Sequence, residues 1–512
     1  MDVFNLNFET PDWGLILPQL IVFFTALVLV FSDAFIGASR HFRVLTGASI
    51  VGYSAALIAL YWQRGEVSMT FQGSFRADGL TVFLSMVILV AAILSVLVSA
   101  NYIEYFEEKV PLGEYYILLS FSILGALLVA SAGDLIIIFI GLELSALATY
   151  VLTAYARRRT ESVEGALKYF LLGIFASAIL LYGMAWTYGL SGSTDLDEIR
   201  SAVSEAVAGQ DFLEASVLLA LLLLVVGLGF KIAAVPFHMW TPDAYEGAPT
   251  PVTAYMSVIP KVAGFAALIR ILVQGLGPLA DDWTWIVAVL ALLTMALGNI
   301  VALSQQNLKR MLAYSSIAHT GYMMVGLAAY RDVGGFSGES LGSGGITSLL
   351  YYMLAYAFMN IGAFAVLAWL QERGKGVTLN DMSGLASTHP LPAAAMAVFM
   401  VSLMGIPPLL GFYAKYYVIV AAIDADFLWL AIAIVLMSGL SAYYYLRVVF
   451  NMYFGSSITS ARVAATPLLN VAIIVMVIAN LALGLFSQGI VDLGDEWSTA
   501  LTVASSAVGL GQ

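Results

Sequence analysis

The sequence contains no cysteine, so this chain has no disulfide, iron–sulfur ligand or thiol nucleophile of its own. Charge is scarce, because Asp, Glu, Lys and Arg make up 11% of the residues where a soluble domain has about 25%. The formal net charge of −12 argues against nucleic acid as a partner. HExxH, CxxC, Walker and complete GxGxxG patterns are absent too. We therefore expect no metal or cofactor bound by this chain.

Apolar residues dominate instead, at 61% of the sequence and a mean hydropathy of +0.92. Apolar runs of roughly 20 residues recur from end to end, and each is long enough to cross about 30 Å of hydrocarbon. A membrane barrel would show alternation over about ten residues instead. The opening MDVFNLNFETPDWG has no basic segment of a cleavable signal peptide, so we expect the first helix to be retained. The pattern predicts an all-α, polytopic membrane protein.

Length and hydropathy predict about fourteen transmembrane helices. The predicted spans are residues 13–34, 44–62, 79–100, 115–131, 134–156, 164–190, 214–240, 250–275, 283–303, 311–330, 346–370, 391–422, 427–450 and 466–487. The connections are short, and the longest, near 191–214, is polar and acidic. Because no linker is typical of a soluble domain boundary, we predict a single membrane domain over residues 1–512.

Lysine and arginine are distributed unequally between alternate loops, which predicts the orientation in the membrane. The richer set of loops contains Arg40, Arg43, Lys109, Arg157, Arg158, Arg159, Lys309, Arg310, Arg373, Lys375 and Arg462. The opposite set contains only Arg64, Arg76, Arg200 and Arg331. The richer set is therefore expected in the cytoplasm, with both chain termini on the non-cytoplasmic side.

Two of the predicted spans, the seventh and the twelfth, are interrupted by proline. The seventh has Lys231 before Pro236, and the twelfth has Lys415 after Pro407 and Pro408. Proline removes a backbone donor and clashes with the preceding turn, so both helices should break. Because the two spans are five apart, the units of residues about 115–275 and 283–450 would be inverted repeats. Paired broken helices of this kind point to a transport site.

Four ionisable residues fall well inside the spans, where charge costs about 2.5–3.5 kcal/mol on insertion scales. Glu143 is about ten residues into its span, Lys231 is midway along the first broken helix, Lys261 is near the middle of span 250–275, and Lys415 belongs to the second broken helix. We predict that Glu143 and Lys231 pair, which would couple their titration. The alternative for each residue is a purely structural role, such as a glutamate kept protonated by burial.

Other polar residues carry weaker predictions. His238 and His319 are candidate proton relays, and the alternative for each is a histidine that is simply hydrogen-bonded, which is the commoner case in an apolar stretch. Lys168, Arg270 and Arg447 fall near span ends, where interfacial anchoring is the better explanation. The tyrosines, among them Tyr352 and Tyr445, are interpreted mainly as packing and as an interfacial aromatic belt.

Five stretches resemble the antiporter-like proton-pumping subunits of respiratory complex I, and within that family subunit N of bacterial NADH–quinone oxidoreductase. They read LIIIFIGLELSALATYVLTAY, GALKYFLLGIFASAILLYG, FKIAAVPFHMWTPDAYEGAPTPVTAYMSVIPKVAGF, NLKRMLAYSSIAHTGYMMVG and GIPPLLGFYAKYYV. The resemblance implies that Glu143 and Lys231 form the family's glutamate–lysine pair. Lys261 matches the lysine at the centre of its hydrated axis, and Lys415 matches the terminal lysine. His238 and His319 fall where family members have histidines of less certain role.

The resemblance implies a function as well. This chain would move protons across the bacterial inner (plasma) membrane, coupled to quinone reduction elsewhere in the complex. Its partners would be membrane lipid and other membrane subunits of complex I, including neighbouring antiporter-like subunits, and partner subunits would hold the quinone, flavin and iron–sulfur clusters. A subunit of a multi-subunit Na⁺/H⁺ antiporter is the closest alternative. A structural membrane subunit that does not pump is the other.

Overall fold

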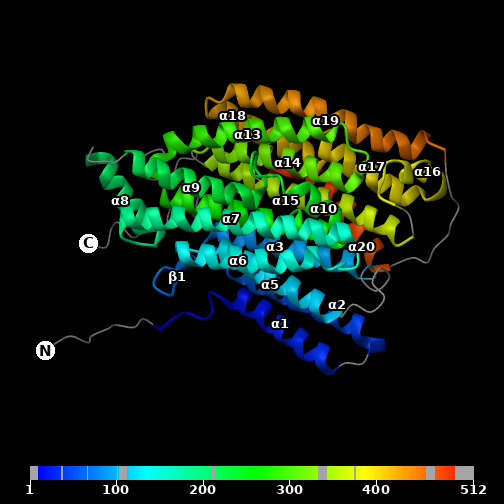
Figure 1. The fold of residues 1–512 in the computed structure, drawn as a ribbon, viewed down its shortest axis with the longest axis horizontal. Coiled ribbons are helices and arrows are strands. Elements are labelled where there is room, and N and C mark those ends of the chain that lie inside the picture. The colour runs from blue at the N-terminus through cyan, green and yellow to red at the C-terminus, as the bar shows by residue number, and fades with distance from the viewer. Residues whose placement is uncertain are drawn as a thin grey trace.

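The structure is a computed structural model, and its helices lie side by side along the long axis of an elongated bundle (Figure 1). It describes residues 10–35, 38–65, 67–100, 102, 112–209, 214–331, 343–373, 376–456 and 467–489. Both chain termini lie outside these ranges, so the prediction of their side of the membrane is not addressed by the described residues. Lys109, Lys375 and Arg462 lie outside them too.

Helices occupy every predicted span. They are α1 (Leu17–Phe35), α2 (Ala38–Trp62), α3 (Gly79–Ser99), α5 (Leu112–Ala130), α6 (Leu135–Thr153), α7 (Thr160–Ser191), α9 (Glu214–Ile232), α10 (Thr241–Gly247), α11 (Thr250–Met256), α12 (Ile259–Leu268), α13 (Ala280–Ala302), α14 (Leu308–Ala328), α15 (Ser343–Gln371), α17 (Pro390–Met404), α18 (Leu410–Asp424), α19 (Leu428–Phe454) and α20 (Pro467–Leu485). Within the described residues, eleven helices are long and apolar enough to cross a membrane. The polytopic all-α fold is confirmed, and the count of fourteen crossings stays a prediction.

Both proline interruptions are confirmed as breaks. The helix α9 ends at Ile232 and α10 begins at Thr241, while α17 ends at Met404 and α18 begins at Leu410. Span 250–275 is interrupted too, which we did not predict: α11 ends at Met256, α12 begins at Ile259, and a π-helical stretch, η1 (Ile269–Gly275), follows. The inverted relation of the two halves stays a prediction.

The polar connection near 191–214 is not a plain loop, because it contains the helix α8 (Leu196–Gly209). The Asp195 carboxylate accepts from the backbone N–H groups of Asp197 and Glu198, which caps the helix. Acidic residues in the first turn also suit the positive end of the helix dipole. The remaining small elements are the antiparallel strands β1 (Ser68–Thr70) and β2 (Phe75–Ala77), the 3₁₀ turns η2 (Gly277–Leu279) and η3 (Asn380–Met382), and α16 (Leu385–Thr388).

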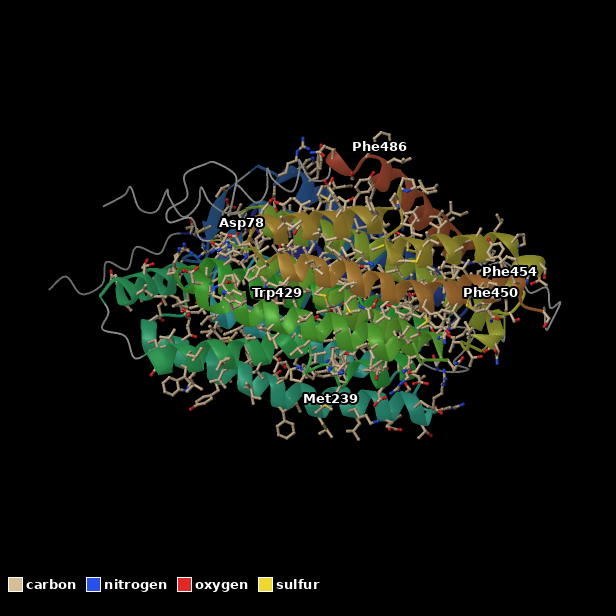
Figure 2. The ribbon with its side chains drawn as sticks, turned by 90° about the horizontal axis from the view of Figure 1, so that it is seen from above. Asp78, Met239, Trp429, Phe450, Phe454 and Phe486 are labelled. Carbon is tan, nitrogen blue, oxygen red and sulfur yellow. The ribbon has the colours of Figure 1, made fainter. Side chains whose placement is uncertain are left out.

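Burial separates a central set of helices from an outer one. In the most apolar stretch of the segment from α11 to η1, and likewise of the helix α15, 94% of the residues are buried. The helix α14 is buried along almost its whole length. Large apolar side chains lie on the outside, including Met239, Phe450, Phe454 and Phe486 (Figure 2). Such a surface suits contact with lipid or partner subunits. Buried polar residues gather on the central helices.

Candidate functional site

Glu143 on α6 and Lys231 on α9 form an ion pair. Lys231 Nζ donates to Glu143 Oε1 over 2.8 Å, and the two side chains are 6% and 23% exposed. Ser177 on α7 donates from Oγ to the same carboxylate oxygen over 2.5 Å and accepts from Lys231 Nζ over 3.1 Å. Three helices, α6, α7 and α9, therefore meet at one carboxylate oxygen, and the predicted partners are in contact.

The end of α9 explains why a lysine is accommodated there. Lys231 lies in the last turn, where the helix dipole and free carbonyls favour a cation. The carbonyls released by the break are bonded from elsewhere: the Trp240 indole donates to the Phe230 oxygen over 3.1 Å, and Thr320 Oγ1 donates to the Ile232 oxygen over 3.0 Å. The break is thus held in one conformation by α14 and by the turn itself.

Lys261, on α12, is bound by α14. Its Nζ donates to the Ser316 carbonyl oxygen over 2.8 Å, to Ser316 Oγ over 2.5 Å and to Thr320 Oγ1 over 2.8 Å. Because Thr320 also binds the Ile232 carbonyl, one threonine joins Lys261 to the residue after Lys231.

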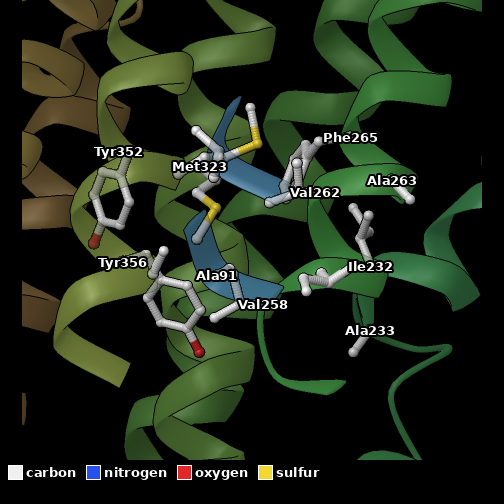
Figure 3. Packing of buried hydrophobic residues seen from close by; sticks show 14 of the residues in the cluster. Ala91, Ile232, Ala233, Val258, Val262, Ala263, Phe265, Met323, Tyr352 and Tyr356 are labelled. Carbon is white, nitrogen blue, oxygen red and sulfur yellow. The ribbon is translucent and has the colours of Figure 1, made fainter. Parts of the chain in front are cut away.

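Close approach of α12 to α9 makes this link possible. A Cβ on Gly264 would lie 2.6 Å from Ile232 Cγ2, so only glycine permits the contact. Figure 3 shows Ile232 and Ala233 beside Val262 and Ala263, with Tyr352 and Tyr356 on the other side of Met323. The segment with Lys261 therefore packs closely against the segment with Lys231.

His319 lies on α14 among tyrosines. Its Nδ1 lies 2.7 Å from the Tyr352 hydroxyl and its Nε2 lies 3.1 Å from the Tyr445 hydroxyl. The Tyr356 hydroxyl donates to Ser316 Oγ over 2.8 Å. Tyr352 and Tyr445 pack in the core, as predicted, although neither is interfacial, and their hydroxyls also contact the nitrogens of the histidine ring.

Lys415 is 5% exposed and has a different environment. Its Nζ donates to the Met404 carbonyl oxygen, at the end of α17, over 2.9 Å. It also lies 5.0 Å from the centroid of the Tyr322 ring, and that ring packs edge-on against His319 at 5.6 Å. No carboxylate within 4.0 Å pairs with Lys261 or Lys415 among the described residues. Both amines bind neutral oxygens, and Lys415 also lies over an aromatic face.

His238 does not join the other five predicted residues. It lies half-buried in the turn between α9 and α10, next to the exposed Met239. Its Nδ1 has no hydrogen-bond partner among the described residues. In the part of the chain that the structure describes, no hydrogen bond joins His238 to the lysines or to His319.

Sequence reasoning missed several polar contributors and misread one arginine. Ser177, Ser316 and Thr320 bind the lysines directly, yet a hydroxyl residue in an apolar span carries little signal of its own. Arg270 was predicted as an interfacial anchor, and this was wrong. Its side chain is fully buried and forms a bidentate pair with Asp78 at 2.5 and 2.8 Å. The described residues include no group of His, Cys, Asp and Glu that could hold a metal ion.

Charged residues near the α10 end of the bundle form a separate cluster. Lys168 pairs with Glu164 at 2.7 Å and with Asp243 at 2.8 Å, so its exposed position agrees with the prediction for it. Arg310 pairs with Asp243 at 2.7 Å and with Glu246 at 2.8 Å. These pairs fasten α10 to α7 and α14.

Comparisons with known proteins agree on one family. Residues 132–441 match the model described as "NADH:quinone oxidoreductase/Mrp antiporter, TM". The NADH-quinone oxidoreductase subunit N of Trichlorobacter lovleyi is 43% identical over 448 residues, covering 87% of this chain and 88% of the relative. A chain of respiratory complex I from Thermus thermophilus is 32% identical with a TM-score of 0.77, covering 94% and 100%. A chain of the Mrp complex from a Dietzia species has a TM-score of 0.80 at 21% identity, covering 96% and 99%, which shows a shared fold.

Proposed function

Because the chain belongs to the NADH:quinone oxidoreductase/Mrp antiporter transmembrane family, we propose that it is the subunit N of an NADH–quinone oxidoreductase and moves protons across the membrane. The observation that carries this proposal is the row of buried amines joined through α14. Thr320 of α14 binds both the Ile232 carbonyl, next to Lys231, and the Lys261 amine, and α14 also carries His319. Buried ionisable groups in a membrane bundle are costly, and they mark ion pathways.

The proposed route runs from the ion pair to the second broken helix. A proton reaches Glu143 and Lys231 from the cytoplasmic side and passes by water and hydroxyl groups to Lys261. His319 and its tyrosines then lead toward Lys415. Separation of Glu143 from Lys231 changes the proton affinity of each, because an opposite charge within hydrogen-bond distance stabilises the charged form of both. Movement at this pair therefore biases which lysine holds the proton.

The energy for pumping comes from quinone reduction in neighbouring subunits, since this chain contains no redox ligand. In this proposal the partners are membrane lipid and other membrane subunits of the complex, including neighbouring antiporter-like subunits. The quinone, flavin and iron–sulfur clusters are held by partner subunits of the complex. The chain lies in the bacterial inner membrane with both termini on the non-cytoplasmic side. This orientation is supported by the distribution of lysine and arginine between loops.

An antiporter subunit shares the fold, as the likeness to the Mrp chain illustrates. The higher identity to subunit N relatives favours the oxidoreductase. Purification of the native complex separates the two, because quinone-reducing subunits accompany the chain in one case and antiporter subunits in the other. A structural subunit without a pathway is disfavoured by three buried lysines at or beside helix breaks, one of which pairs with Glu143.

Replacement of Lys231 by Met in the native complex tests the proposal. Proton uptake per quinone reduced is measured in inside-out vesicles, and we expect it to fall, since the amine that receives the proton is gone. Lys231→Arg keeps the positive charge, but arginine does not release its proton, so proton uptake per quinone reduced should fall in this variant as well. Arg64→Met, at an exposed cation, is the control and should pump normally. Unchanged pumping in Lys231→Met would contradict the proposal.

A further inference from the structure

Tyr150, on α6, is a buried hydroxyl that the proposed route does not yet use. The residue is 5% exposed, and its hydroxyl has no hydrogen-bond partner among the described residues. Its ring packs edge-on against two rings of α7, Tyr169 at 4.5 Å and Phe170 at 5.7 Å, so the Tyr150 side chain lies against that helix. Buried hydroxyls are almost always hydrogen-bonded, and where protein offers no partner, water does so.

Space for this hydroxyl is provided by Gly173 on α7. A Cβ at Gly173 would overlap the Tyr150 hydroxyl oxygen, so a glycine is required where the tyrosine touches the helix. Gly173 lies one turn before Ser177, which corresponds to about 6 Å along the axis. Ser177 is the residue that donates to Glu143 and accepts from Lys231. The hydroxyl is therefore about one turn of α7 away from the ion pair.

The geometry of α6 agrees. Tyr150 follows Glu143 by seven residues, which places the two on one face with their Cα atoms about 10 Å apart along the axis. Long side chains on a helix lean toward its N-terminus, so the Tyr150 side chain leans back toward Glu143. Tyr150 also lies between Glu143 and the end of α6 that precedes Arg157–Arg159.

We infer that the Tyr150 hydroxyl is a proton-relay residue between that end of α6 and the Glu143–Lys231 pair. The inference rests on the proposed function. A water bridges the hydroxyl and the carboxylate, and a second water lies on the far side of the hydroxyl. The outer water takes up the incoming proton and passes one hydrogen to the tyrosine oxygen. The hydroxyl's own hydrogen passes to the inner water, which gives one proton to the Glu143 carboxylate. The hydroxyl is unchanged after the transfer.

The alternative is that Tyr150 only packs. On the neighbouring helix α7, Tyr169 packs against Tyr150. On its own helix, the titratable group that interacts with Tyr150 is Glu143. Tyr150→Phe distinguishes the two roles, since it keeps the ring and its contacts and removes only the oxygen. Tyr182→Phe is the matched control, because that hydroxyl belongs to a side chain of α7 that is 56% exposed.

The experiment uses the native complex in inside-out vesicles and measures quinone reduction, proton uptake and the solvent deuterium isotope effect on uptake. Lys231→Met sets the loss expected when the chain does not pump. We expect Tyr150→Phe to assemble normally, to show most of that loss, and to change the isotope effect, while Tyr182→Phe matches the unmodified complex. Gly173→Ala, which displaces the hydroxyl, should give a similar loss.

The outcomes distinguish failure of the Tyr150 relay from failure of the proposed function. If Lys231→Met loses uptake and Tyr150→Phe keeps both the uptake and the isotope effect, the relay is overturned and the proposed function stands. If Lys231→Met itself pumps normally, the proposed function fails. Loss of uptake in Tyr150→Phe with an unchanged isotope effect and lowered assembly would show a packing role and overturn the relay as well.

Discussion

The two broken helices hold their lysines in unlike ways. In both, the ammonium group lies at the C-terminal end of the helix before the break: Lys231 in the last turn of α9, and Lys415 against the Met404 carbonyl that ends α17. Both positions suit a cation, because carbonyls and the negative end of the helix dipole point there. The first lysine has a carboxylate at 2.8 Å, whereas the second has a carbonyl and the Tyr322 ring.

This difference teaches how one framework can give two proton affinities. The charge of Lys231 depends on the position of Glu143, so a shift of α6 or α9 changes it. The site at Lys415 has no matching acid among its described contacts, which are the Met404 carbonyl and the Tyr322 ring. The first site is therefore suited to respond to a neighbour, and the second to receive what the first releases.

The largest expected contrast is in stability. Lys231→Met leaves the Glu143 carboxylate without its ammonium group, and breaking a buried pair costs about 3–5 kcal/mol, with the low end expected since Glu143 is still 23% exposed. Lys415→Met leaves only a carbonyl without a donor, which costs about 1–3 kcal/mol. Thermal unfolding of the solubilised complex should rank the two in this order. Glu143→Gln/Lys231→Met should recover part of the loss, and equal loss in both single variants would break the comparison.

A smaller effect is expected from the neutral neighbours of each lysine. Ser177→Ala removes a hydroxyl that binds both members of the ion pair, which costs about 0.5–1.5 kcal/mol. Tyr322→Leu removes the aromatic face below Lys415, for which about 0.5–2 kcal/mol is expected. Both variants should slow proton uptake less than loss of the lysine does. Tyr322→Phe keeps the ring, and a loss in it equal to that in Tyr322→Leu would show that the ring face is not what supports Lys415.

The smallest effect is expected at His238. This histidine lies in the first break, yet it contacts none of the lysines, so His238→Gln should leave proton uptake unchanged. His319→Gln should lower it, because His319 contacts two tyrosine hydroxyls beside the row of amines. Proton uptake by both variants is measured in the same vesicles. A loss in His238→Gln as large as that in His319→Gln would place the route through the first break.

Much of this architecture was predictable because its causes are local. Apolar runs predict spans, and proline beside a lysine predicts a broken helix, so both interruptions were expected. The break between α11 and α12 was missed, since Pro260 lies in the first turn of α12, where proline is tolerated. The rotation of each helix depends on distant partners. For this reason the pairing of Arg270 with Asp78 and the contacts of Ser316 could not be foreseen.

Proton transfer from the Glu143–Lys231 pair to Lys415 requires a continuous hydrogen-bonded path through the bundle interior. A structure of the native complex that resolves ordered water tests it most directly. We predict water molecules joining the Glu143–Lys231 pair to Lys261, and Lys261 through the surroundings of His319 to Lys415. A dry, closely packed gap on either side of Lys261, wide enough to prevent a hydrogen-bonded chain in every state observed, would contradict the account.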